Sequence, residues 1–289
     1  ALLKLSIEFN KDKNTIVAGG IVRIANGSVI RDGEFKGFSM PKRIIERFQI
    51  VEYYRSFLSG RVSWGISNSM LIVSGAFGVF QKQAVIEVGG YKTSTIGEDM
   101  EIVVRLHSYM RKHKRKYKII FCEDAVCWTQ GPMSLKDIRG QRRRWQIGLL
   151  DTLISHKNLL FNPKYGTVGL VAVPYFWIFE LSGALIEVLG YFIIPFSLIM
   201  GELNIFFFVI YFLLATLLGI MLSIGSLILE QYTKKNAMTA KQYILISVYA
   251  ILENFGYRQL ITLFRVEGIL KYRKLRQTWG KIKRKEFEQ

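Results

Sequence analysis

Histidine and cysteine are scarce, with three and two copies among 289 residues. His107, His113 and His156 are scattered, without the spacing of zinc ligands. Cys122 and Cys127 lie in a stretch that we expect to form a strand, where they would point to opposite faces. The pattern indicates free buried thiols in a reducing compartment, and it argues against a zinc site and a disulfide scaffold.

Acidic residues are also few, since 22 Asp and Glu stand against 40 Lys and Arg and leave a formal net charge of +18. Half of the residues are apolar. This combination is rare in soluble enzymes and is typical of a protein that lies against anionic membrane lipids. The basic run RKHKRKYK joins an expected helix to an expected strand, so we interpret it as a solvated or lipid-facing surface and predict no nucleic-acid partner.

Residues 1–135 alternate between strand and helix patterns, as is typical of an α/β domain. β-Branched runs predict strands at 15–24 and 117–128, and helical periodicity predicts a helix at 98–114. The stretch 74–91 reads as a strand followed by a short helix that ends at a glycine pair.

Two more helices are expected earlier in this domain. The opening stretch ALLKLSIEF reads as a helix already under way without a signal peptide, so we expect the sequence to start inside a domain. The basic amphipathic stretch at 40–58 is compatible with two places, a membrane surface or the interior of an ordinary domain.

Two long apolar runs follow. The stretch 205–229 has no charged side chain over 25 residues, more than the roughly 20 that cross a bilayer. The stretch 168–199 is longer still and must tilt, protrude or break near Pro195. Its only charged residues, Glu180 and Glu187, share a helical face, which we expect to turn toward protein or a polar passage.

We therefore predict two transmembrane helices within 167–232 and a different arrangement for 233–289. A third apolar run, at 243–264, contains charged residues. Under the positive-inside tendency the catalytic part and the C-terminal tail are both cytoplasmic, which requires an even number of crossings. We expect this third run to be a re-entrant or interfacial segment, with three full spans as the alternative.

The adjacent carboxylates Glu98 and Asp99 open the helix expected at 98–114. A carboxylate at a helix N-terminus is stabilised by free backbone N–H groups and by the helix dipole, which is a sufficient structural reason for the pair. The same place below a strand edge would let a carboxylate take a proton from an incoming hydroxyl. The dipeptide alone is compatible with both interpretations.

A second motif, QRRRW, lies in a region at 136–166 that we expect to form an interfacial amphipathic helix. On a helix, Gln141, Arg144 and Trp145 share one face. The amide and the forked guanidinium suit a pyrophosphate, and the tryptophan suits the face of a sugar ring.

The other two arginines of this motif, Arg142 and Arg143, point away from that face. We expect them to contact lipid head groups or solvent. A simpler interpretation makes the whole segment a basic interfacial helix with its tryptophan at the water boundary. Both can hold at once, because they use different faces of one helix.

The order of these motifs resembles a known family. The sequence contains, in this order, SGAFGVF, GED, QRRRW and apolar helices. This order looks like the C-terminal half of the catalytic domain and the membrane region of a membrane-embedded family 2 glycosyltransferase. Relatives in that family include the bacterial cellulose, hyaluronan and poly-N-acetylglucosamine synthases. The resemblance covers most of residues 15–150. It implies an α/β fold, with a partial GT-A-like (nucleotide-diphospho-sugar transferase) domain followed by an all-α transmembrane region.

The resemblance also implies roles for the residues that match the motifs of the family. Asp99 would be the general base that deprotonates the acceptor hydroxyl, and Glu98 would support its position. Gln141 and Arg144 would contact the pyrophosphate of the nucleotide sugar, and Trp145 would floor the acceptor site. The acceptor pocket near the base would be lined by Ser74, Gly75 and Ala76.

One departure from the family concerns the metal. The family holds Mg²⁺ or Mn²⁺ and the uridine with an Asp-x-Asp motif, and no aspartate of this sequence lies two residues from another. The order of motifs in the family would put that motif just before Ala1, so we expect no metal ligands within this sequence. TWGKIKR, at 278–284, resembles a Trp-containing gating segment, with a basic tail on lipid as the alternative.

These patterns predict an inverting, processive enzyme that transfers a sugar from a nucleotide sugar, a UDP-sugar, to a growing β-linked polysaccharide. It would be an integral protein of the plasma membrane. Two alternatives remain open, namely transfer of a single sugar to a lipid carrier and a catalytically silent membrane subunit of a synthesis or export complex. The expected partners are the nucleotide sugar, a polysaccharide or lipid-linked acceptor, anionic membrane lipids and an export subunit.

Overall fold

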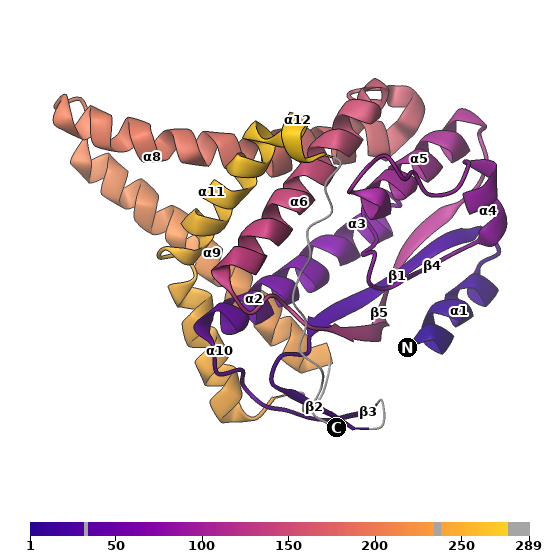
Figure 1. Ribbon diagram of the computed structural model, residues 1–289, viewed down its shortest axis with the longest axis horizontal. Coiled ribbons are helices and arrows are strands. Elements are labelled where there is room, and N and C mark those ends of the chain that lie inside the picture. The colour runs from indigo at the N-terminus through magenta and orange to yellow at the C-terminus, as the bar shows by residue number, and fades with distance from the viewer. Residues whose placement is uncertain (32–33, 234–237, 277–289) are drawn as a thin grey trace.

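The structure is a computed structural model that describes residues 1–31, 34–233 and 238–276. A part with a central sheet lies beside a long pair of helices that extends away from it (Figure 1). The sheet has the strand order β4-β1-β5, and β2 and β3 form a separate hairpin. The strands are β1 (Thr15–Ile24), β2 (Ser28–Arg31), β3 (Glu34–Phe38), β4 (Gly78–Phe80) and β5 (Lys118–Thr129).

Helices surround this sheet and make up the rest of the described chain. The longer elements are α1 (Leu2–Lys11), α2 (Ile44–Tyr54), η1 (Arg55–Arg61), α3 (Val62–Ile66), α4 (Lys82–Glu87), α5 (Glu98–Lys112), α6 (Leu135–Ser155), α8 (Gly183–Ile199), α9 (Ile205–Thr233), α10 (Ala240–Leu252) and α11 (Tyr257–Leu270). The short turns are η2 (Lys157–Leu159), η3 (Pro163–Tyr165), η4 (Val168–Ala172), α7 (Val173–Tyr175), η5 (Phe176–Ser182) and α12 (Tyr272–Leu275).

The strands and helices predicted for the α/β part are confirmed. β1 is buried along its whole length, and it pairs in parallel with β5 and antiparallel with β4. α5 packs on the sheet through Ile102, Val103 and Leu106, which are fully buried. α4 ends at Glu87, and the glycine pair Gly89 and Gly90 that follows has positive φ, as is common after a helix C-terminus.

The two cysteines are free, as expected, but only Cys122 is buried, and Cys127 is partly exposed. The stretch at 40–58 forms α2 and continues through the π-helical η1. Ile50, Val51 and Tyr54 of α2 are buried in a cluster with residues of α9 and α10. One face of α2 therefore packs inside the protein, as in an ordinary domain helix, and its contact with α9 leaves the interpretation as a helix at the membrane surface open.

Two helical stretches, Val168–Ile199 and Ile205–Gln231, are long and apolar enough to cross a membrane. They make up the extended pair in Figure 1. Most of their large apolar side chains are exposed, as lipid-facing residues would be. Of the three outcomes expected for the first stretch, a break near Pro195 does not occur, because α8 continues through this proline. The π-helical turns η4 and η5 lie earlier in the stretch.

The third apolar run is not one continuous helix. α10 has 13 residues and α11 has 14, and they are separated at Glu253–Gly256, where Gly256 has a φ of 102°. At about 1.5 Å per residue, each spans roughly 20 Å, less than the roughly 30 Å hydrocarbon core. This geometry agrees with the segment expected to turn back or lie at the interface. The segment at 278–284 lies outside the described residues.

Candidate active site

The acidic pair opens helix α5, directly after its N-cap residue Gly97. The backbone N–H of Gly75 donates to Oδ2 of Asp99 at 3.1 Å, and the N–H of Met100 donates to its Oδ1 at 2.9 Å. Gly75 lies in the loop before β4, where the N–H of Ala76 also donates to Ser74 Oγ at 3.4 Å. The structure therefore brings the SGA stretch and the acidic pair together.

The second acidic residue connects the two motifs electrostatically. Burial raises the pKa of the Glu98 carboxyl, and the neighbouring charge of Asp99 adds to this shift. The guanidinium of Arg144 acts in the opposite direction. Arg144 of QRRRW is thus close enough to Glu98 to affect the pKa of this carboxyl.

A pair of glycines sets the distance between the two motif helices. A Cβ on Gly97 would lie 2.6 Å from Cα of Gly148 in α6, and a Cβ on Gly148 would lie 2.7 Å from Cα of Gly97. Real Cβ atoms do not approach backbone this closely. The backbones of α6 and of the loop before α5 therefore touch at the point where the acidic pair begins. Gly97 belongs to the GED motif, but no pattern in the sequence indicates its contact with Gly148.

The expected face of α6 divides into a buried part and an exposed part. Gln141 is buried, and its side chain lies close enough to Tyr53 of α2 to influence the pKa of that phenol. Its Oε1 atom has no hydrogen-bond partner among the described residues. Trp145 is 45% exposed. The motif thus offers an unsatisfied buried amide oxygen and an accessible aromatic face.

The prediction for the other two arginines is wrong. Arg142 is 4% exposed, its Nη2 donates to Oε2 of Glu52 at 2.8 Å, and its guanidinium lies 4.4 Å from the ring centroid of Trp145. Arg143 forms an ion pair of 3.1 Å with Glu267 of α11. Both arginines bind carboxylates of the protein rather than lipid or solvent, because α2 and α11 cover the sides of α6 that the isolated helix pattern left open.

Arg61, at the end of η1, is a further member of the site that the sequence did not indicate. Its guanidinium lies 4.0 Å from the ring centroid of Phe57. Burial lowers the pKa of Arg61 to about 10, and the nearby charge of Asp99 acts against this shift. A cation thus stands close to the acidic pair. Its proximity depends on the fold of η1, which no local motif encodes.

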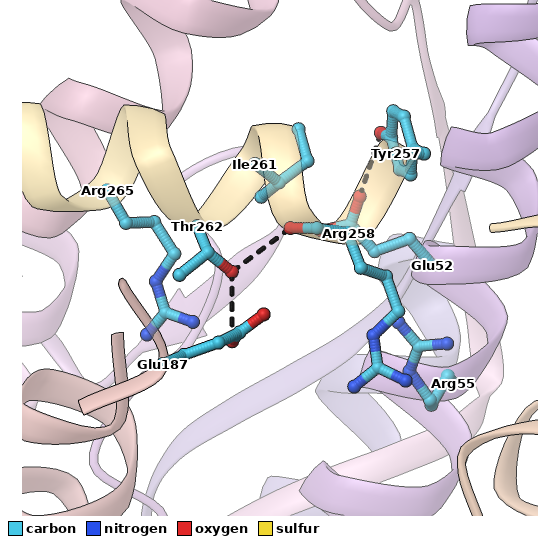
Figure 2. A pocket seen from close by; sticks show the side chains of 8 residues that line it. All are labelled: Glu52, Arg55, Glu187, Tyr257, Arg258, Ile261, Thr262 and Arg265. Carbon is cyan, nitrogen blue, oxygen red and sulfur yellow. Dashed lines mark hydrogen bonds between the residues drawn. The ribbon is translucent and has the colours of Figure 1, made fainter. Parts of the chain in front are cut away.

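A polar cavity of about 150 Å³ lies between α2, α8 and α11 (Figure 2). Thr262 donates to Oε2 of Glu187 at 3.1 Å, and Arg265 forms a contact of 3.3 Å with Glu180. The glutamates of the first apolar run therefore turn toward protein, as expected. The cavity is lined by Glu52, Arg55, Glu187, Tyr257, Arg258, Ile261, Thr262 and Arg265.

Comparison with known proteins identifies the family. The model of glycosyl transferase family group 2 matches residues 37–225, which is well over half of the chain and includes both motifs. The chain belongs to this family. The fold is accordingly the α/β sheet of a glycosyltransferase, followed by apolar helices that could span a membrane.

Curated relatives of this glycosyltransferase match over a shorter stretch. It is 31% identical over 111 residues to the poly-beta-1,6-N-acetyl-D-glucosamine synthase of Staphylococcus aureus (strain COL) and 28% identical to that of Staphylococcus epidermidis. The match covers 38% of this chain and 26% of each relative. A solved mannosyltransferase from Pyrobaculum calidifontis, in complex with GDP-Man and Mn²⁺, aligns with 93% of this chain and 56% of its own, at 12% identity and a TM-score of 0.45.

The described residues of this glycosyltransferase do not fit the divalent metal that its family implies. Within 1–31, 34–233 and 238–276, no three His, Cys, Asp or Glu side chains come together as metal ligands. Around the acidic pair, the nearest charged groups noted above are the cations Arg61 and Arg144. These residues alone therefore do not provide the ligands of a catalytic metal.

Proposed function

We propose that the protein is an inverting, processive glycosyltransferase that transfers a sugar from a nucleotide sugar, a UDP-sugar, to the end of a growing β-linked polysaccharide. The observation that carries this proposal is the contact between Asp99 and the Gly75 backbone, with Arg144 of QRRRW beside the same acidic pair. This contact fixes one carboxylate oxygen at the edge of the loop that would receive the acceptor. A fixed carboxylate next to a substrate hydroxyl is the arrangement that general base catalysis requires.

In this reaction Asp99 takes the proton of the acceptor hydroxyl, and the oxygen attacks the anomeric carbon of the donor. The new C–O bond forms as the bond to the nucleoside diphosphate breaks, and the diphosphate leaves with the electron pair. Attack from the side opposite the leaving group inverts the anomeric configuration. Arg144 and the amide of Gln141 bind the pyrophosphate, since a guanidinium stabilises the developing negative charge.

The acceptor sugar lies on Trp145, between this ring and the loop of Ser74, Gly75 and Ala76. The exposed tryptophan supports this placement, because it offers an apolar face to the C–H groups of a sugar ring. Glu98 keeps the base in position from the first turn of α5. The alternative of single-sugar transfer to a lipid carrier would use the same base and the same donor contacts, and it differs in the acceptor and in the length of the product.

The polar cavity between α2, α8 and α11 supports a polymer product that moves toward the membrane. Glu52 lines this cavity and also binds Arg142, which stacks on Trp145. These contacts connect the cavity to Trp145, on which the proposed acceptor site would lie. We place the catalytic part and the C-terminus on the cytoplasmic side, against anionic lipids, where the nucleotide sugar is available and the positive charge is favourable.

Replacing Asp99 with asparagine in the full-length protein in membranes tests the proposal. Asp99→Asn keeps the shape of the side chain and one acceptor oxygen for the two backbone N–H groups, and it removes the base. Sugar transfer should therefore fall by about 10²–10⁴-fold while nucleotide-sugar binding stays within about twofold. Asp124→Asn, at an exposed site on β5, is the control and should keep full activity. Retained transfer in Asp99→Asn would refute the assignment, and chain-length analysis of the product separates polymer from single transfer.

A further inference from the structure

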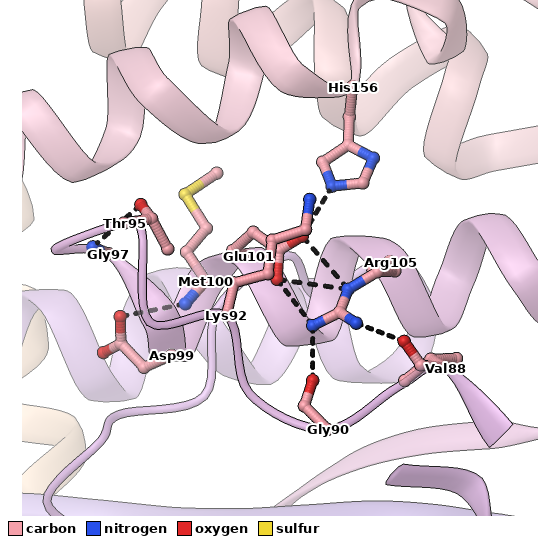
Figure 3. Close-up of polar contacts among 10 residues, drawn as sticks. All are labelled: Val88, Gly90, Lys92, Thr95, Gly97, Asp99, Met100, Glu101, Arg105 and His156. Atoms are coloured by element: carbon pink, nitrogen blue, oxygen red, sulfur yellow. Dashed lines mark hydrogen bonds and ion pairs between the residues drawn. The ribbon is translucent and has the colours of Figure 1, made fainter. Parts of the chain in front are cut away.

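Glu101 is a buried carboxylate that connects three separate segments (Figure 3). Its Oε1 atom accepts from Lys92 Nζ at 2.9 Å and from His156 Nε2 at 3.2 Å, and its Oε2 atom accepts from Arg105 Nη2 at 2.8 Å. Lys92 belongs to the loop before α5, and His156 caps the C-terminus of α6. One side chain thus joins the loop that leads to the acidic pair with the helix that carries QRRRW.

Arg105 extends this connection to the end of α4. Its Nη2 donates to the carbonyl of Gly90 at 2.6 Å, and its Nη1 donates to the carbonyl of Val88. Burial alone would raise the pKa of Glu101, but hydrogen bonds from His156, Lys92 and Arg105 outweigh burial and lower this pKa to about 2. Glu101 is therefore charged at neutral pH, and its carboxylate is stabilised by hydrogen bonds from these three side chains.

The segment from Lys92 to Gly97 is held at both ends. At one end Lys92 binds Glu101, and at the other Gly97 rests on Gly148 of α6. Between them, Thr95 is buried and its Oγ1 accepts from the N–H of Gly97 at 3.3 Å. The residue after Gly97 begins the acidic pair, so a shift of this loop would move the pair directly.

A second cavity, of about 290 Å³, lies next to this loop. It is lined by Lys92, Ser94, Thr95, Glu101, Asp151, Ser155 and Arg276. The loop therefore has free space on one side and can be displaced into it when a contact is lost. In a tightly packed interior the same loss would leave the loop in place.

We propose that Glu101 is a positioning residue that holds the loop at 92–97, and through it Asp99, in register with the QRRRW helix. This inference rests on the proposed function. Glu101 lies two residues after Asp99, about 200° around the helix, so it faces away from the acceptor loop and cannot itself touch the acceptor. It acts through Lys92 and His156, which fix the loop and α6 relative to α5.

The variant Glu101→Gln in the full-length protein in membranes tests this role. It keeps the shape of the side chain and removes the charge that binds Lys92 and Arg105. A displacement of the base near 1 Å should lower kcat for transfer by at least about tenfold and leave the donor KM within about twofold. The ratio of donor hydrolysis to sugar transfer should rise at least about threefold. Water can take the place of a misaligned acceptor hydroxyl as the nucleophile, whereas both reactions use the same donor.

The hydrolysis ratio distinguishes positioning from a structural role, since a smaller amount of folded protein lowers both reactions equally. Glu87→Gln is the matched control, because Glu87 forms an ion pair with Arg115 on the surface. If Glu101→Gln does not accumulate, Lys92→Gln is the second variant. It removes only the contact between Glu101 and the loop, at a lysine whose side chain is 43% exposed. It should raise the same ratio of hydrolysis to transfer. A variant with the kinetics of Glu87→Gln overturns the proposal.

Hydrogen exchange separates this inference from the proposed function. Amides of residues 93–97 should exchange at least about tenfold faster in Glu101→Gln than in the wild type, whether or not any sugar is transferred. A wild-type protein that transfers no sugar would refute the function and leave the exchange result to decide the structural part. Unchanged exchange at 93–97 would refute the role of Glu101 even in an active enzyme.

Discussion

Replacing Arg142 with alanine should destabilise the protein without releasing it from the membrane. Arg142 is buried, and its guanidinium makes a bidentate contact with Glu52, which also accepts from Tyr257 at 3.3 Å. Arg142→Ala leaves this carboxylate without its bidentate cationic partner in the mostly buried wall of the polar cavity. Removing one member of a buried pair is more harmful than removing both, because the remaining charge stays uncompensated.

The magnitude follows from the burial of the pair. Loss of one partner of a buried ion pair costs about 3–5 kcal/mol, and the lower value applies here because the Glu52 side chain remains 17% exposed and keeps Tyr257. The contact of Arg142 with the ring of Trp145 adds about 0.5–1 kcal/mol. The total of about 3.5–4 kcal/mol corresponds to a decrease in Tm of roughly 7–8 °C, at about 2 °C per kcal/mol for a chain of this size.

Thermal unfolding in detergent and salt extraction of membranes measure the two effects separately. Arg144→Ala, on the same helix, is the comparison and should lose donor turnover with a change in Tm of less than about 2 °C. The double variant Arg142→Ala/Glu52→Gln should recover part of the lost stability, since it no longer contains an uncompensated carboxylate. An unchanged Tm in Arg142→Ala, together with extraction by salt, would refute the buried pair and support a lipid contact.

Two further predictions concern the packing and the pH response of the α/β part. Gly148→Ala forces a Cβ against Gly97 and should lower kcat/KM by about 10²-fold in a transfer assay, whereas Gly140→Ala on the same helix has free space and should be neutral. The second prediction concerns His107, which is buried. Its Nε2 lies 2.9 Å from the Met70 carbonyl and its Nδ1 lies 2.7 Å from the Tyr117 hydroxyl. Burial lowers the pKa of this imidazole to about 4. The imidazole therefore binds a proton more tightly in the unfolded chain than in the folded one. The free energy of unfolding, measured by urea titration, should fall as pH decreases from about 6.5 to 4. His107→Gln should flatten this dependence on pH.

The elements of the α/β part were predictable because their signals are local. β1 is a β-branched run that is buried throughout, and α5 carries apolar residues at helical spacing above an acidic first turn. The order of the motifs was sufficient to place Asp99 with the SGA loop and Arg144 near the same site. The predictions of single elements depend on residues that are adjacent in sequence or on one helical face, whereas the meeting of Asp99 with the SGA loop and Arg144 followed from the resemblance to the family.

The wrong predictions concern partners that are distant in sequence. The helical positions of Arg142 and Arg143 were read from α6 alone, and the pattern of one helix contains no information about Glu52 of α2 or Glu267 of α11. The same reason applies to Arg61, whose place near the acidic pair depends on the π-helical turn η1. Long-range ion pairs of this kind follow from the fold, and no local motif specifies them.

The break between α10 and α11 shows how such a pair can change the membrane topology expected from hydropathy. Glu253 is fully buried and binds both Arg55 of η1 and Ser223 of α9. A carboxylate inside a lipid-facing helix would be costly, but here it faces the α/β part and is paired. The polar residues of the third apolar run are thus accommodated because the chain turns at Gly256 and returns toward α6. The hydrophobicity of the run favours the membrane, whereas Glu253 and its cationic partner keep this segment beside the candidate active site.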